Sequence, residues 1–342
     1  MAGRRRATSA DVARLAGVSR TTVSFVLNER ADANIAEETR RRVRAAAVEL
    51  GYHVHGPAQA LAGGATQTIG LVLRQHPDQA AADALLADTL WGIGGEVQKR
   101  GYRVLVEPLP PVGGSYAGLV RSQRVDGLIV SGPRSDDTEL AALVEEEFPI
   151  ILQGWLPGLA APSVDVDNRA GAASAVRHLM ALGHRRIACI TNAPRAYTAA
   201  EERLAGYRDA VEGGGLGYEE ELVVEGAFDA SSGRLAMRTL LARSAPFTGV
   251  FIASDVVAFG ALGALRDAGR RVPADVSVVG FDDIPLARHF DPPLTTVHLP
   301  ARALGEAAGR AIIERLSGQP GTSRLLLDTE LIVRDSTAAP GR

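Results

Sequence analysis

Apolar residues follow two different patterns along the chain. Up to about residue 52 they recur at helical spacing, as in Val43, Ala47 and Leu50. After residue 68 they form continuous runs, separated by amphipathic stretches that are long enough for helices. The first pattern predicts a small helical domain, and the second predicts buried parallel sheets with crossover helices.

The second region alternates predicted strands with predicted helices. Strands are predicted at 69–73, 103–107, 127–130, 149–152, 186–191, 249–253 and 276–281. Helices are predicted near 83–100, 168–182, 199–213, 230–243, 255–268 and 301–317. This order indicates two doubly wound sheets with helices on both faces, so we expect a ligand beyond the carboxyl ends of the strands.

The first region predicts three short helices. Thr8 followed by Asp11 is typical of a helix N-cap with an acidic first turn, and Gly17 is expected to end that helix. A second helix is expected from the cap Ser19 to about Asn28. The third is expected from about Ala36 to Leu50, and Gly51 is expected to end it.

The second helix has two faces, because successive residues turn by about 100°. Val23, Val26 and Leu27 share the face that is expected to pack on the first helix, against Val12, Leu15 and Ala16. The outward face carries an arginine, two hydroxyls and an aromatic ring, at Arg20, Thr21, Ser24 and Phe25. Such side chains suit a helix that reads base edges in the DNA major groove. An ordinary helical hairpin with one exposed phenylalanine is the alternative.

Charge is divided unevenly between the two regions. Residues 1–55 hold ten Arg against six acidic residues, and the remaining 27 basic and 34 acidic residues complete the net charge of −3. A small basic region on an acidic body suggests that only the first region meets a polyanion such as double-stranded DNA. A solvated arginine run at residues 4–6 is the alternative interpretation.

Composition excludes several classes of protein. The length of 342 residues and the hydrophobic content of 46% suffice for two or three domains with cores. Cys189 is the single cysteine and the histidines have no zinc spacing, so we expect no metal, no cofactor and a reducing compartment. The sequence shows no signal peptide and no apolar run of membrane length, which indicates a cytoplasmic protein without a membrane partner. It also shows no Gly-x-Ser-x-Gly elbow or phosphate-binding glycine loop, so we do not expect an enzyme.

Two sets of motifs resemble the LacI/GalR (lactose-repressor) family of bacterial transcription regulators. The run from Thr8 through DVARLAGVSRTTVSFVLN, with LGY at 50–52, is similar to the family's helix-turn-helix head. RLAGY at 203–207, the long run at 271–300 that contains VVGFDD, and ELIVRDST at 330–337 are similar to its periplasmic-binding-protein-like effector domain. The resemblance covers nearly the whole chain.

The resemblance implies a domain organisation. A helix-turn-helix DNA-binding domain is expected at 1–55, a hinge helix or linker at 56–65, and an effector-binding and dimerisation domain at 66–342. The last contains two doubly wound α/β subdomains. The N-subdomain is expected at about 66–168 and 299–326, and the C-subdomain at about 169–298 and 327–342.

The resemblance also implies DNA-binding residues. In the head they are Ser19, Arg20, Thr21, Thr22, Ser24, Phe25 and Asn28, with Arg20, Thr21 and Phe25 at the family's specificity positions. In the hinge, Leu61 matches a leucine that enters the minor groove. The chain departs from the family at Ala36, where a serine usually caps the third helix.

The effector site implied by the resemblance comprises Arg203, Asp282, Asp167, Phe228 and Ser254. Arginine can hold paired hydroxyls or a carboxylate, and aspartates can accept from sugar hydroxyls. The alternatives are that Arg203 and Asp282 only join the domains and that Phe228 is a core residue. Asp83 to Leu86 stand where relatives have aromatic rings, so an effector other than a simple hexose is expected.

Together these features predict a sequence-specific DNA-binding transcriptional regulator that acts as a repressor. It is expected to bind a pseudo-palindromic operator as a homodimer or tetramer. Its effector is expected to be a sugar or related metabolite bound between the subdomains. A transporter's solute-binding protein and a sugar-modifying enzyme are the alternatives. The basic helical head disfavours the first, and the lack of a catalytic motif disfavours the second.

Overall fold

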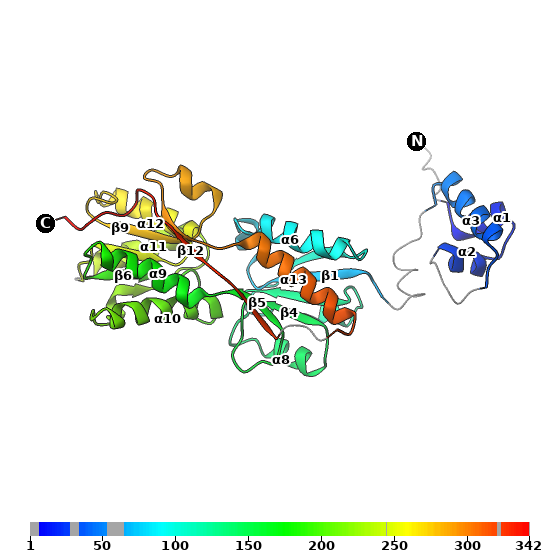
Figure 1. Ribbon diagram of the computed structural model, residues 1–342, viewed down its shortest axis with the longest axis horizontal. Helices are drawn as coiled ribbons and strands as arrows, with labels where there is room; N and C mark the ends of the chain where they lie inside the picture. The colour runs from blue at the N-terminus through cyan, green and yellow to red at the C-terminus, as the bar shows by residue number, and fades with distance from the viewer. Residues whose placement is uncertain (1–6, 28–33, 53–64, 244, 320–322, 342) are drawn as a thin grey trace. The chain divides into compact units, whose positions relative to one another are not determined.

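The computed structural model describes residues 7–27, 34–52, 65–243, 245–319 and 323–341 (Figure 1). The helices of the head form one compact unit, and the elements from β1 onward form the other. We describe the head and the body separately. No helix among the described residues is long and apolar enough to cross a membrane.

The head consists of α1 (Ser9–Ala16), α2 (Arg20–Leu27) and α3 (Glu37–Glu49). The predicted caps are confirmed. Thr8 and Asp11 form a capping box, and Gly17 ends α1 with a φ of 66°. The Ser19 hydroxyl accepts a hydrogen bond from the backbone N–H of Thr22 at 3.0 Å. Ala36 contributes no side-chain bond at the start of α3, as its methyl group requires.

The core of the head differs from the prediction at Leu15, which is 47% exposed. The buried stripe of α1 is Val12, Ala13 and Ala16. Leu15 lies about 110° around the helix from the centre of that stripe, so it cannot reach α2. Ala13 is buried instead. Val23 and Val26 of α2 share one apolar cluster with Val43, Ala46 and Ala47 of α3, and Leu27 packs against it half-buried.

The first lobe of the body is built on a parallel sheet with the strand order β11-β5-β4-β3-β1-β2. Its strands are β1 (Thr68–Leu73), β2 (Arg103–Pro108), β3 (Gly127–Ser131), β4 (Ile150–Gln153), β5 (Ser163–Val166) and β11 (Arg324–Leu327). Its helices are α5 (Pro77–Ala81), α6 (Leu86–Gln98), α7 (Ala117–Val120), α8 (Thr138–Glu145) and α13 (Ala301–Leu316).

The second lobe has the strand order β12-β10-β9-β8-β6-β7, in which only the β12–β10 pair is antiparallel among the described strands. Its strands are β6 (Ile187–Ile190), β7 (Val223–Val224), β8 (Gly249–Ile252), β9 (Ser277–Asp282), β10 (Thr295–His298) and β12 (Glu330–Ile332). Its helices are α9 (Asn168–Ala181), α10 (Thr198–Gly213), α11 (Ala230–Ala242) and α12 (Asp255–Asp267), with short 3₁₀ turns at Glu220–Leu222 and Pro285–His289.

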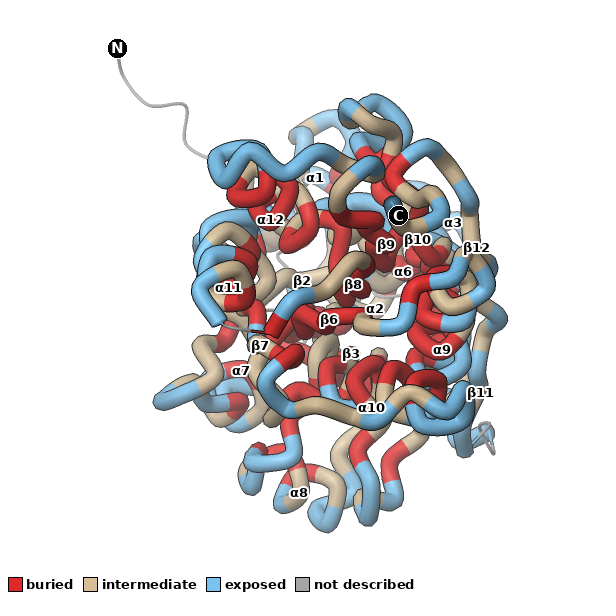
Figure 2. Tube along the Cα trace, turned by 90° about the vertical axis from the view of Figure 1, so that its left-hand side faces the viewer, coloured by how far each residue is buried: buried red, intermediate tan, exposed pale blue. Residues whose placement is uncertain are grey.

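The predicted fold class is confirmed, although short elements escaped the pattern. Strands β6, β8 and β9 are buried, as the red tube in Figure 2 shows, because helices cover both faces of a parallel sheet. Two-residue β7 and four-residue α7 are too short to show a period. The chain passes between the lobes three times, at 166–168, 298–301 and 327–330.

Glycines bring paired helices into backbone contact. A Cβ on Gly305 of α13 would lie 2.3 Å from the Thr89 carbonyl oxygen of α6, and one on Gly92 of α6 would lie 2.2 Å from the Arg302 carbonyl oxygen. A side chain at either position would force the helices apart. The close contact fixes Thr89 and Leu304, which both line the pocket described next.

Candidate ligand pocket and DNA-reading helix

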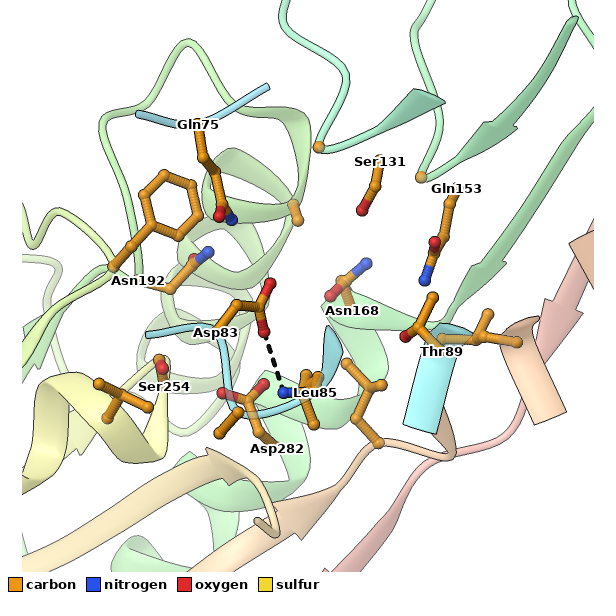
Figure 3. Close-up of a pocket in the computed structure, with 18 of the residues that line it drawn as sticks. Gln75, Asp83, Leu85, Thr89, Ser131, Gln153, Asn168, Asn192, Ser254 and Asp282 are labelled. Carbon is orange, nitrogen blue, oxygen red and sulfur yellow. Dashed lines mark hydrogen bonds between the residues drawn. The ribbon is translucent and has the colours of Figure 1, made fainter. Parts of the chain in front are cut away.

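A pocket lies between the two lobes of the body, at the carboxyl ends of their strands (Figure 3). Ser131 ends β3, Gln153 ends β4 and Asp282 ends β9, and all three line it. This is where doubly wound sheets bind ligands. The remaining polar lining comprises Gln75, Gln79, Asp83, Thr89, Asp165, Asn168, Asn192, Arg203 and Ser254, with Phe228 as the aromatic residue.

Arg203 on α10 is the cation of this pocket and is only 5% exposed. Its Nε donates to Asn168 Oδ1 at 2.8 Å, and its Nη1 donates to the Ala253 carbonyl at 2.6 Å and to Asp282 Oδ1 at 3.3 Å. The guanidinium carbon lies 3.7 Å from the centroid of the Phe281 ring. Burial lowers the pKa of Arg203, and Asp282 opposes that effect. The fork is therefore held rigidly in one orientation.

Asp282 is the carboxylate that faces Arg203. Its φ of 118° is rare for a non-glycine residue and turns the chain sharply as β9 ends. Burial raises the pKa of Asp282 to about 6, although Arg203 acts in the other direction. The neighbouring Asp255 has its pKa raised by burial and by Asp282, while it accepts from Thr296 Oγ1 at 2.6 Å and Ile284 N at 3.0 Å. Two buried carboxyl groups thus meet under the pocket.

The titration of Asp282 predicts a pH effect on stability. A carboxyl group whose pKa is raised in the folded state stabilises the fold fully below its unfolded value, and this contribution is lost as the pH rises through about 6. The free energy of unfolding of the wild type, relative to Asp282→Asn, should be greater at pH 5 than at pH 7.5 by about 1 kcal/mol. Urea titrations of both proteins at both pH values measure this.

Two histidines have the opposite effect on the pH dependence of stability, and the comparison with Asp282→Asn cancels their contribution. Burial lowers the pKa of His178 and of His184, so each destabilises the fold as the pH falls through the unfolded value near 6.5. Both histidines are present in both proteins and cancel in the difference. Equal differences in free energy at pH 5 and pH 7.5 would contradict the raised pKa of Asp282.

Asp167 does not line the pocket, which corrects the sequence-based prediction. It is exposed, and its Oδ1 accepts from Ala170 N at 2.8 Å as the N-cap of α9. Asp165, two residues earlier, takes the predicted position, and burial raises its pKa to about 6. Asp165 still belongs to β5, whose pleat directs it to the pocket, whereas the chain has left the strand at Asp167.

Asn168 connects the Asp165 carboxylate to the Arg203–Asp282 pair. Its Nδ2 donates to Asp165 Oδ1 at 3.0 Å, and its Oδ1 accepts from Arg203 Nε. Asp165, Asn168, Arg203 and Asp282 therefore form one buried chain of polar contacts along the floor of the pocket. Asn168 was not predicted as a site residue, because it belongs to none of the motifs named above and only the adjacent Asp167 matched a position of the family's site.

Phe228 and Ser254 line the pocket as predicted. The Phe228 ring packs edge-on against Tyr197, with centroids 4.8 Å apart and planes at 86°. Phe228 is only half-buried, so part of its ring remains available to a ligand. Ser254 precedes α12 without capping it through its side chain.

Three amide side chains around the pocket have buried oxygen atoms that find no hydrogen-bond partner within the part of the chain that the structure describes. They are Gln75 Oε1, Gln153 Oε1 and Asn192 Oδ1; Figure 3 shows the Gln75 and Asn192 side chains on one side of the pocket and Gln153 on the other. A buried acceptor without a donor costs about 1–3 kcal/mol. Ligand hydroxyl groups would supply the missing donors. These residues belong to no motif, so only their position in the fold marks them.

The lobes contact each other directly beside the pocket. Ser135 N donates to the Ala196 carbonyl at 2.9 Å, and Thr198 N donates to the Pro133 carbonyl at 3.2 Å. Gln79 Nε2 donates to the Ala227 carbonyl at 3.1 Å. These bonds hold the lobes together at positions other than the three chain crossings.

The candidate DNA-reading helix is α2 of the head. Arg20 and Thr21 are exposed in its first turn, while the Thr22 hydroxyl is paired with that of Ser19 at 2.9 Å. Ser24 and Phe25 are half-buried, so both are only partly exposed on the face that is predicted to point outward. The ring lies at the border between the core face and the exposed face. Asn28 and Leu61 lie outside the described residues.

A helix-turn-helix head that precedes a two-lobed ligand-binding body is the architecture of a DNA-binding regulator. The family model for bacterial regulatory proteins of the lacI family matches residues 8–54, and the model for the periplasmic binding protein-like domain matches residues 176–337. The chain belongs to the LacI family of bacterial transcriptional regulators, and it is a DNA-binding regulator rather than an enzyme.

Curated relatives match over nearly their whole length. The HTH-type transcriptional regulator CelR of Thermobifida fusca is 38% identical over 98% of this chain and 100% of its own. The HTH-type transcriptional repressor PurR of Vibrio campbellii is 33% identical over 96% of this chain and 98% of its own.

Solved structures agree with this placement. A complex of the transcriptional regulator CelR with cellobiose matches at 36% identity and a TM-score of 0.75, over 97% of this chain and 100% of the other. The lac repressor dimer bound to operator and the anti-inducer ONPF matches at 30% identity and a TM-score of 0.84, over 98% of this chain and 100% of the other.

Proposed function

We propose that this protein is a repressor whose affinity for operator DNA is controlled by a sugar bound between the lobes of the body. The observation that carries the proposal is the buried Arg203–Asp282 pair in the pocket, together with three buried amide oxygens of the lining that have no partner among the described residues. Hydroxyl groups of a sugar can donate to those oxygens and to the carboxylates. The CelR relative, whose structure contains cellobiose, supports the same ligand class.

The binding residues follow from the pocket and from α2. We propose that Arg203, Asp282, Phe228 and Ser254 bind the effector and that Asp165 acts in place of Asp167. Arg20 and Thr21 read bases, and Ser19, Thr22, Ser24 and Phe25 orient or extend that contact. Asn28 and Leu61 stay predictions, as do the boundaries of the head at 1–55, the hinge at 56–65 and the body at 66–342.

Control requires the lobes to respond to the ligand. A sugar that bridges both lobes stabilises the closed arrangement, and the change reaches the DNA-binding heads of a homodimer on a pseudo-palindromic operator. Coupling between two such sites is typically about 1–3 kcal/mol, or roughly 5- to 150-fold in operator affinity. The protein works where the chromosome lies, in the cytoplasm and on the nucleoid.

A gel-shift assay with fragments of the source genome tests this function. We expect sequence-selective complexes that weaken as salt rises, since phosphate contacts release counterions. Addition of the effector should change the midpoint of the titration. Binding that is equal for all fragments, or absent at low salt, would refute the proposal.

Phe25→Ala is expected to reduce discrimination between operator base pairs. Replacing it with alanine removes an apolar contact to a thymine methyl or a sugar edge, so discrimination at one base pair of each half-site should fall by about tenfold. Competition gel shifts with single-base operator variants measure the loss. Because the ring is half-buried, the head should also lose about 1 kcal/mol of stability. Unchanged discrimination at every base pair would assign Phe25 to the core alone.

A further inference from the structure

The charges around the pocket are unbalanced. The charged lining residues, all among those described, are Asp83, Asp165, Asp282 and Arg203. Arg203 already donates through Nε and Nη1 to protein acceptors and faces Asp282. Asp83 and Asp165 therefore leave the pocket with excess negative charge when they are ionised.

Asp83 and Asp282 reach the pocket from different lobes. It lies between α5 and α6 in the first lobe, whereas Asp282 ends β9 in the second lobe, and both point into the pocket in Figure 3. Its Oδ1 accepts from Leu85 N at 2.9 Å, which fixes the carboxylate. Burial raises the pKa of Asp83, and the charge of Asp83 raises that of Asp282, so the two groups repel each other.

An independent observation points to a ligand at this place. Asn192 lines the pocket and is only 8% exposed, and its buried Oδ1 has no hydrogen-bond partner among the described residues. Gln75 and Gln153 add two more buried oxygens of the same kind. Three aspartates line the pocket against a single arginine, so ligand groups that donate hydrogen bonds are favoured over groups that carry negative charge.

We infer that the pocket selects a sugar without an acidic group, and that Asp83 is the specificity-determining residue that rejects phosphorylated and carboxylated sugars. The inference rests on the proposed function, because it names the class of sugar for the same pocket. Separate hydroxyl groups of a neutral sugar donate to Asp83 of the first lobe and to Asp282 of the second, and so draw the lobes together. A phosphate or carboxylate brings a like charge into a desolvated site, where repulsion is strong.

Calorimetric titration of the full chain tests the inference. A panel of unmodified mono- and disaccharides that includes cellobiose is first screened by thermal shift, and each sugar that binds is compared with its 6-phosphate and its uronic acid. We expect the unmodified sugar to bind at least about 100-fold more tightly than either acidic form. In Asp83→Asn, the unmodified sugar should lose up to about tenfold in affinity and the acidic forms should gain about tenfold.

Asp88→Asn is the matched control. Asp88 is an exposed residue in the first turn of α6 that does not line the pocket, and the substitution removes the same charge. It should leave the preference for the unmodified sugar in place. If Asp88→Asn shifts the preference as much as Asp83→Asn does, the effect is one of net charge and the role of Asp83 is refuted.

Two results of the sugar titrations would overturn the inference. An acidic sugar that binds the wild type as tightly as its unmodified parent overturns the inference, and so does a panel in which no sugar binds. Operator binding by the wild type without sugar is scored separately by gel shift. Failure of the proposed function would appear as the absence of a selective complex, or as a complex that no sugar of the panel affects, whereas failure of this inference alone would leave the complex and its response to sugar intact.

Discussion

Arg203→Ala is expected to abolish the response of operator binding to the effector, with a loss of at least about 100-fold in effector affinity. The substitution removes the bonds to Asn168, Ala253 and Asp282, and it removes the charge-assisted donor that a sugar hydroxyl or ring oxygen would meet. Calorimetry measures the loss of affinity, and gel shifts with and without effector measure the loss of response. Operator binding without effector should persist.

The same substitution leaves buried carboxyl groups without their cation. Removing one partner of a buried pair typically costs about 3–5 kcal/mol of stability, so thermal unfolding must be recorded first. Arg203→Lys keeps the charge but loses the planar fork, and it should retain the fold while losing most of the effector affinity. A variant of either kind that folds and still responds fully would exclude Arg203 from the effector site.

Arg208→Ala is the control on the same helix. Arg208 packs over the Tyr218 ring, with its guanidinium carbon 4.4 Å from the ring centroid, and does not line the pocket. The effector should act on this variant as it does on the wild type. An equal loss of response in both variants would mean that charge or stability of α10, rather than ligand contact, is being measured.

Arg20→Ala is expected to lower affinity for the operator by about 10- to 100-fold and to relax selectivity at one base pair of each half-site. Arg20 is exposed in the first turn of α2, where a guanidinium can reach the paired acceptors of guanine. Binding to unrelated DNA should fall much less, because it depends on total charge. Gel shifts with operator and scrambled duplexes at two salt concentrations give both quantities.

Arg41→Ala removes the same charge from the same head. Arg41 is an exposed residue of α3 that pairs with Glu38 at 2.6 Å. It should reduce affinity for operator and scrambled DNA by the same small factor. If Arg20→Ala behaves in the same way, Arg20 contacts phosphate and does not read bases.

Local features of the head were predictable because they depend on neighbours in the sequence. The capping box at Thr8 and Asp11, the turn at Gly17 and the cap at Ser19 each involve residues within three or four positions. The burial of Leu15 and Phe25 was not predictable to the same degree. Both lie at the border of an apolar stripe, where the angle between packed helices decides which side chains are covered.

In the pocket, too, some residues were predictable from sequence motifs and others were placed only by the tertiary structure. Arg203 and Asp282 were identified through motifs, but the choice between Asp165 and Asp167 depends on the residue at which β5 ends. A carboxylate within the strand follows the pleat into the pocket, and one just beyond it caps the next helix. Gln75, Gln153 and Asn192 belong to no motif and are brought together by three separate strand ends.

The sequence by itself determined the order of helices and strands, the class of fold, the family and the pair of charged residues in its motifs. These properties follow from periodicity, capping and short runs of residues, which act over a few positions of the chain. Only the tertiary structure decided that Asp83 and Asp282, 199 positions apart, belong to one pocket. Burial between two lobes makes their charges interact strongly, and burial is a property of the packed molecule.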